Sequence, residues 1–400
     1  MRVRPPWVSL LLLAAARVSA QSDAEVSDPM DLQVHGFVSQ GFLVTTDNNY
    51  LAESESGSFE FTEVGINFTK PLGQDFRVGL QLFARDLGPA GNYRVNPDWF
   101  YLDYRYRDWF GFRAGRVKLP FGLYNEVNDI DAARVPVLLP QSTYPIGNRD
   151  YLLAQTGGEV YGYFKLDRAG AFDYRLYGGT IYVVAEQNSN TPYRITRVNI
   201  PYVAGGRLMY ETPLEGLRAG ASLQRISMDL DLAFDSAAWM PLQMAGMLPD
   251  DFNGDVAVDL PVVLWMGSIE YAAHDLQLAV EYGRWYVKAE SDVPALFPDV
   301  EQHSERMYGL VAYRFSEWFV PSFYYSLLFP DTSDRTGRDK RQQDFALTTR
   351  FDLTEHWLIK LELHYLNGTA ALASNLNDNR PQRRLTRDWL LFLAKTTAYF

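Results

Sequence analysis

Apolar and polar residues alternate along most of the chain, in sixteen segments separated by turns. Alternation with a period of two predicts β-strands that have one apolar and one polar face. Most of the segments have roughly the 9–11 residues that a tilted strand needs to cross a bilayer. The predicted strands are residues 32–44, 59–69, 75–85, 98–107, 109–118, 158–166, 171–183, 204–211, 216–228, 261–272, 276–288, 304–315, 318–329, 344–353, 356–366 and 388–400.

The connections between these segments alternate in length. Each odd-numbered segment is followed by a long connection and each even-numbered one by a short turn such as KPLGQ, DRAG or AHD. An even number of strands with all long loops at one end is the layout of an outer-membrane β-barrel. A soluble sandwich has no physical reason to adopt this layout. We therefore predict an all-β fold, a 16-stranded antiparallel transmembrane β-barrel.

The two faces of the predicted strands support this fold. In residues 356–366, Trp357, Leu361 and Tyr365 alternate with charged residues such as Lys360 and Glu362. An apolar outward face suits lipid, and a charged inward face suits a water-filled lumen. Aromatic residues also recur just after the short turns, where an interfacial girdle is expected, and these are Phe76, Trp109, Phe172, Trp318 and Trp357.

The central segment, residues 119–156, interrupts the alternation. It joins the fifth and sixth predicted strands and is therefore the third long loop. A connection of this length without an obvious element of its own is usually functional. We expect it to fold into the lumen and to narrow it, as a constriction loop.

The N-terminus predicts export. Arg2 and Arg4 precede a short apolar run over residues 8–16, and small residues precede a cleavage site after Ala20. Residues 1–20 are therefore predicted to be a cleaved signal peptide, and residues 21–400 a single barrel. The chain has a formal net charge of −12 and no cysteine, so we expect no nucleic-acid partner and no disulfide.

Two stretches of the central region, GRVKLPFGLYNE (115–126) and LPQSTY (139–144), resemble the Gram-negative outer-membrane porin superfamily. The first stretch resembles the segment that enters the constriction loop in relatives of the phosphate-selective porins O and P. The resemblance implies a homotrimer in the outer membrane of a Gram-negative bacterium, surrounded by outer-membrane lipids, which lets small hydrophilic solutes and ions diffuse passively. The chain departs from those porins because it has no compact ladder of arginines here.

Charged residues at the narrowest point would set the selectivity of such a pore. Opposite charges that face each other across a constriction would orient polar solutes, whereas charges that pair along the wall would only rigidify it. Because the inward positions lean basic while many acids lie in external loops, we expect weak anion selectivity or none. The candidate pore-lining residues are Arg77, Arg105, Arg113, Arg116, Lys118, Glu126, Asp129, Asp131, Arg134, Arg175, Lys360 and Glu362.

Two other functions remain to be compared with a general pore. A channel specific for a sugar or an anion could use lumen arginines and the loop aromatics Phe121, Tyr124, Tyr144 and Tyr151. An outer-membrane hydrolase would need an activated nucleophile, but none of the five histidines has a nucleophile motif such as G-x-S-x-G nearby. We therefore expect no enzymatic activity, no cofactor and no metal ion.

Overall fold

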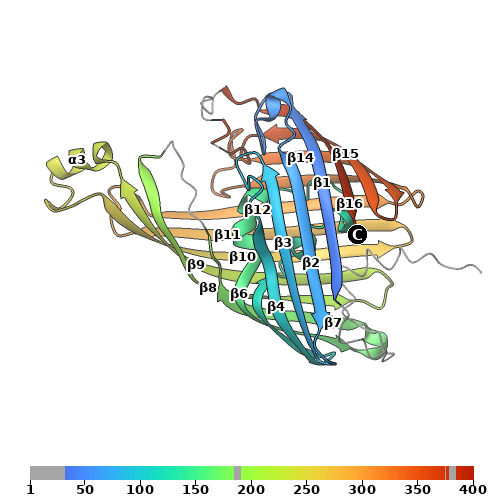
Figure 1. Cartoon of the computed structure of the whole chain (residues 1–400). Coiled ribbons are helices and arrows are strands. Elements are labelled where there is room, and N and C mark those ends of the chain that lie inside the picture. The colour runs from blue at the N-terminus through green and yellow to red at the C-terminus, as the bar shows by residue number, and fades with distance from the viewer. Residues whose placement is uncertain (1–31, 184–190, 374, 378–383) are drawn as a thin grey trace, which may run out of the picture.

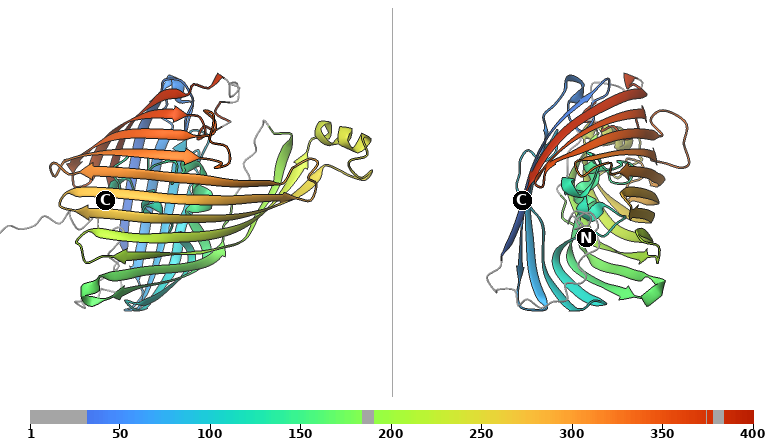
Figure 2. Two further views of the ribbon diagram at one scale, coloured as in Figure 1. Left: turned by 180° about the vertical axis from the view of Figure 1, so that it is seen from behind. Right: turned by 90° about the vertical axis from the view of Figure 1, so that its right-hand side faces the viewer.

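The computed structural model describes residues 32–183, 191–373, 375–377 and 384–400. In it, sixteen strands form one closed antiparallel barrel in chain order, as Figures 1 and 2 show. The predicted fold class is thus confirmed, while the predicted signal peptide lies outside the described residues. The strands are β1 (Gln33–Thr45), β2 (Phe61–Pro71), β3 (Phe76–Leu87), β4 (Asn96–Arg107), β5 (Phe110–Lys118), β6 (Ala154–Lys165), β7 (Ala171–Thr180), β8 (Tyr193–Glu211), β9 (Leu217–Phe234), β10 (Asp255–Ala273), β11 (Leu276–Ser291), β12 (Val300–Tyr313), β13 (Phe319–Phe329), β14 (Gln342–Thr354), β15 (Trp357–Gly368) and β16 (Asp388–Tyr399).

The barrel closes where its first strand pairs with its last. The register of β1 and β16 runs from Phe37 opposite Tyr399 to Thr45 opposite Leu391. Beyond this ladder the backbones of Gly36 and Phe400 exchange two hydrogen bonds, each of 3.0 Å. These contacts satisfy backbone groups that would otherwise form two open edges.

Side chains alternate between the two faces of the wall as predicted. On β15, Leu361 and Leu363 are 39% and 46% exposed, whereas Lys360 and Glu362 point inward and are 0% and 1% exposed. The aromatic residues beside the short turns lie on the outer surface, and Trp109 is 47% exposed. Among the described residues, no helix has the length and apolar character needed to span a membrane.

Four neighbouring strands extend further than the alternation predicted. Strands β8, β9, β10 and β11 have 19, 18, 19 and 16 residues, and their far ends project beyond the rest of the rim together with α3 (Ser236–Met244), as Figure 1 shows. Much of the predicted loops 184–203 and 229–260 is therefore strand. The β8–β9 pairing shifts register between Ile195 and Arg197 and between Asn199 and Tyr202, and such bulges hide a strand from a simple two-residue period.

The projecting part of the sheet, here called the rim extension, has a small core of its own. Leu232, Phe234, Val256 and Val258 are buried there, and residues of the flanking loops such as Phe297 pack against them. The rim extension is therefore a packed layer and does not depend on the barrel interior for all of its contacts.

The long central loop lies inside the barrel, as predicted, and is visible there in Figure 2. It is shorter than expected, because β6 already begins at Ala154. Residues 119–153, here called the inner segment, contain only short helical pieces, which are η2 (Asn125–Val127), η3 (Asp131–Ala133), η4 (Ile146–Asn148) and α2 (Arg149–Leu152).

Candidate functional site: the inner segment and the wall around it

Local chemistry turns the chain out of β5 and into the lumen. Pro120 has no backbone N–H and cannot continue a strand ladder. Gly122 has φ +63°, a left-handed conformation that suits glycine, and a Cβ there would lie 2.5 Å from the hydroxyl of Tyr144. The two ends of the inner segment are joined by a hydrogen bond from Leu119 N to Leu153 O of 2.8 Å, so the segment starts and ends at one place on the wall.

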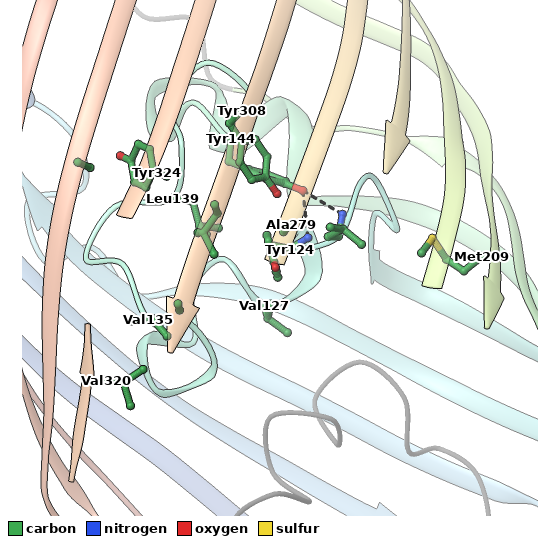
Figure 3. Packing of buried hydrophobic residues seen from close by; sticks show 14 residues of the cluster. Tyr124, Val127, Val135, Leu139, Tyr144, Met209, Ala279, Tyr308, Val320 and Tyr324 are labelled. Atoms are coloured by element: carbon green, nitrogen blue, oxygen red, sulfur yellow. Dashed lines mark hydrogen bonds between the residues drawn. The ribbon is translucent and has the colours of Figure 1, made fainter. Parts of the chain in front are cut away.

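Glu281 of β11 anchors the first part of the inner segment. Its carboxylate accepts hydrogen bonds from the backbone N–H of Leu123 (2.9 Å), from the hydroxyl of Tyr308 (2.8 Å) and from the hydroxyl of Tyr144. Tyr144 also accepts bonds from the backbone of Leu123 and Tyr124 (Figure 3). These contacts tie two stretches of the inner segment to one wall residue, within the cluster of buried residues that Figure 3 shows.

Glu126 connects the inner segment to two neighbouring strands. Its oxygens lie 2.6 Å from Arg175 of β7 and 3.0 Å from Arg207 of β8. Burial alone would raise the pKa of Glu126, but these guanidinium groups outweigh it and lower the pKa to about 2. The carboxylate therefore stays charged at any ordinary pH.

Asp129 anchors the middle of the inner segment beside β4 and β5. Its carboxylate lies 3.2 Å from Lys118 and 2.9 Å from Arg149, and Arg149 also bonds Asp98 of β4 at 2.6 Å. Burial opposes the charge of Asp129, but Arg149 and Lys118 hold its pKa well below the usual range. Arg116 lies next to this group and donates from Nε to the carbonyl of Asp98 at 2.9 Å.

Lys360 of β15 provides the most buried contact. Its ammonium group lies 3.0 Å from the carboxylate of Asp131 and donates to the carbonyls of Asp131 and Arg134 at 2.7 and 2.8 Å. Asp131 also contacts Lys395 of β16 at 3.5 Å and accepts a 2.8 Å hydrogen bond from Thr397. Burial disfavours a charged Asp131, yet the two lysines hold the pKa of its carboxyl far below the usual range.

Glu362, two residues along the same strand, holds the next turn of the inner segment. It accepts backbone hydrogen bonds from Val137 at 2.7 Å and from Leu138 at 2.9 Å. His364 contacts the same carboxylate at 2.9 Å. The inner segment therefore spans the lumen and is bonded to wall strands on opposite sides of the barrel.

A row of alternating charges crosses the wall beside the inner segment. Arg77 of β3 pairs with Asp103 of β4 at 2.6 Å, Asp103 faces Arg113 of β5 at 3.4 Å, and Arg113 bonds Glu159 of β6 at 3.1 Å. Arg175 continues the row, at 3.7 Å from Glu159. This arrangement, here called the charge belt, ends at Arg207 and Asp173, 3.3 Å apart.

The structure brings together most of the residues predicted to line the constriction. Arg105 is different, because it pairs with Asp108 at 2.8 Å beside a short turn at the end of β4. Arg134 turns back on its own segment and donates to the carbonyl of Pro136 at 3.0 Å. The sequence prediction missed Glu159 and Arg207, although the alternation within β6 and β8 could have assigned both to the inward face.

The inward charges are more buried than a water-filled lumen implies. Lys360 and Glu362 are 0% and 1% exposed because the inner segment covers them. Arg77 and Asp173 of the charge belt and the adjoining Glu126 retain 34%, 28% and 25% exposure, whereas the other side chains of the belt are at most 11% exposed. The inner segment thus covers the wall around Lys360, whereas Arg77 and Asp173 on the charge belt keep part of their surface accessible.

The loop aromatics serve packing. Phe121, Tyr124 and Tyr144 are 2%, 7% and 3% exposed. Their rings lie in the two clusters of buried residues that join the inner segment to the wall. These three present no open stacking surface to a solute, whereas Tyr151 is partly buried and packs against the second cluster.

No protein-family model and no curated protein matches the chain. Solved structures do match it. The match with the anion-selective porin of Comamonas acidovorans covers 92% of this chain and 99% of that porin, with 12% identity and a TM-score of 0.58. The fold is that of a porin. Two further structures share this fold. The match with OmpT of Vibrio cholerae covers 94% of this chain and 99% of OmpT, with 9% identity and a TM-score of 0.59. The match with the outer membrane channel DcaP of Acinetobacter baumannii covers 92% of this chain and 97% of DcaP, with 13% identity and a TM-score of 0.53. None of the three is described as phosphate-selective, so the narrower resemblance to porins O and P is not shown.

Proposed function

We propose that the protein is an outer-membrane porin of a Gram-negative bacterium, through which small hydrophilic solutes and ions diffuse passively. The observation that carries the proposal is the inner segment, which is folded into a closed barrel and held to its wall by charged contacts. An outward apolar face, aromatic residues beside the short turns and the porin fold support the membrane location.

The proposed passage runs between the inner segment and the charge belt. Arg77, Asp173 and Glu126 retain 34%, 28% and 25% exposure there, whereas the contacts around Lys360 close the opposite side. A narrow passage lined by both signs of charge favours small polar solutes and resists apolar ones. The buried loop aromatics argue against a sugar-stacking channel.

Conductance in planar bilayers tests this function. The refolded mature chain is expected to insert and to give steady ohmic channels, in groups of three steps if the proposed homotrimer forms. A variant that opens the lumen, with residues 130–142 of the inner segment replaced by a short Gly-Ser linker, should conduct severalfold more per step. A barrel that inserts but conducts in neither form would refute the proposed channel.

A further inference from the structure

Two long loops at the rim border an open pocket of about 500 Å³. One loop connects β13 to β14, and the other contributes the residue before β16. The loops are held together by the backbone N–H of Thr369, which donates to the carbonyl of Arg338 at 2.6 Å, and by Arg338, which donates to the carbonyl of Leu385 at 2.7 Å. The pocket is lined by Arg335, Thr336, Gly337, Arg338, Arg341 and Arg387.

The lining is strongly basic in a chain that is otherwise acidic. Four of the six lining residues are arginines and none is an acid, whereas the whole chain has a formal net charge of −12. Arginine is suited to phosphate because its planar guanidinium group offers several donors in a fixed geometry. The concentration of guanidinium groups here therefore differs from the balanced pairs of the charge belt.

The arginines of the pocket keep much of their binding capacity. Arg341 and Arg387 donate to the neutral side-chain oxygen of Asn367 at 3.4 Å. Each guanidinium group has five N–H donors, so donors remain for a ligand. Acids do lie nearby: Glu305 pairs with Arg335 at 2.6 Å, and Asp388 accepts a 2.7 Å hydrogen bond from Tyr365 and interacts electrostatically with Arg341 and Arg387. Asp334 and Asp339, in the same loop as Arg335, contact Lys340 at 3.5 and 3.8 Å, and Asp334 also accepts a hydrogen bond from the hydroxyl of Thr336 at 3.1 Å.

The pocket lies at the upper edge of the outward face. Asn367 follows Leu363 and Tyr365 in the alternation of β15, and these two residues are 46% and 43% exposed on the outer surface. Arg341 and Arg387 converge on Asn367 just beyond this apolar stripe. In a membrane, the level directly above lipid-facing side chains is the level of the headgroups.

We propose that this pocket binds a phosphate monoester group, and that in the cell the phosphate belongs to a headgroup of the leaflet around the rim. The guanidinium groups of Arg341 and Arg387 supply paired N–H donors to the phosphate oxygens. The lipid source rests on the proposed membrane location, whereas phosphate binding by the pocket does not.

Native mass spectrometry of the protein released from nanodiscs tests the lipid source. The discs contain phosphatidylcholine with either diphosphorylated lipid A or the same lipid after enzymatic dephosphorylation. The wild-type protein is expected to retain the phosphorylated lipid, and the variant Arg341→Gln/Arg387→Gln to retain about tenfold less, because it loses charge-assisted hydrogen bonds. The matched control Arg194→Gln/Arg197→Gln removes two exposed charges from the rim extension and should behave as wild type.

Calorimetric titration of the detergent-solubilised protein with inorganic phosphate separates the sources. Binding of free phosphate that is lost in the pocket variant, without retention of lipid A, would assign the pocket to a free anion. Retention of lipid A that is lost in the same variant would assign it to the headgroup. Equal binding by wild type and pocket variant, or binding of neither ligand, would overturn the proposal. If the protein does not insert into nanodiscs at all, that result would count against the proposed membrane function. The phosphate titration would then decide whether the pocket binds phosphate.

Discussion

Single buried charges hold the inner segment in place. Lys360 has three acceptors in that segment within 3.0 Å, namely the carboxylate and carbonyl of Asp131 and the carbonyl of Arg134. Burying an ammonium group is costly, and the cost is offset only because it is paired and fully hydrogen-bonded. Such a residue fixes the inner segment in one position, since any displacement of the segment leaves buried charges without partners.

Replacement of Lys360 by methionine should therefore be strongly destabilising. The Lys360→Met barrel retains the buried carboxylate of Asp131 but loses the ammonium group that lies nearest to it. We therefore expect a loss of about 3–5 kcal/mol in the free energy of unfolding. Urea unfolding in detergent, followed by tryptophan fluorescence, measures it. Lys288→Met is the control, because Lys288 forms a half-exposed pair with Glu290 and such pairs contribute about 0–1 kcal/mol. Similar losses in both variants would show that burial of Lys360 is unimportant.

The contact between Glu126 and its two arginines should survive mild acid. The pKa of Glu126 is lowered to about 2 in the folded protein, so its contribution to stability is present above the ordinary glutamate pKa of about 4.3 and is lost only as the pH falls towards 2. This contact should accordingly contribute no change in conductance between pH 7 and pH 4. In Arg175→Gln, which removes the nearest guanidinium group, the acid-induced change should move to higher pH. An identical pH profile in the two proteins would contradict this account.

At the scale of elements, alternation was sufficient to predict all sixteen strands. It failed where the backbone is bulged, as on β8 between Asn199 and Tyr202. It also could not predict the path of the inner segment. That path depends on pairs such as Asp131 with Lys360, which are far apart in the sequence and follow no period. Membership of the inward face was predictable from parity, whereas the partner of each charge was not.

The rim extension should be dispensable for the barrel. Its small core is formed by its own strands and loops, and Asp231 lies directly opposite Ala257 in the β9–β10 ladder. A chain in which an Asn-Gly turn joins these two positions should therefore still fold, with little change in thermal stability or conductance. Heat-modifiable migration on a denaturing gel and single-channel recording measure the two properties. Failure of this shortened chain to form a barrel would show that the extension is part of the folding core.

At the scale of the whole molecule, net charge is a poor guide to selectivity. The chain is acidic, but arginines and carboxylates are paired along the charge belt. Inside the proposed passage, a solute lies closer to these pairs than to the acids of the external loops. Selectivity should therefore be weak.

Reversal potentials in a KCl gradient should show little preference for either ion. Arg77→Gln removes a half-exposed positive charge and should shift the preference towards cations, whereas Asp173→Asn removes a negative charge on the same belt and should shift it towards anions. The two variants serve as controls for each other. Shifts of the same sign, or strong cation preference in the wild-type channel, would place the passage elsewhere.

The seam between β1 and β16 also has a consequence for how the protein is made. The seam joins the first strand of the barrel to the last, as Gly36 and Phe400 illustrate. The barrel is therefore completed by a contact between residues that are very far apart in the sequence. Loop closure over such a distance is slow, and until it occurs both outer strands expose unpaired backbone that can add to other chains. The unfolded protein therefore needs protection until β16 pairs with β1, and a chain that lacks β16 would form an aggregation-prone sheet in place of a slightly smaller barrel.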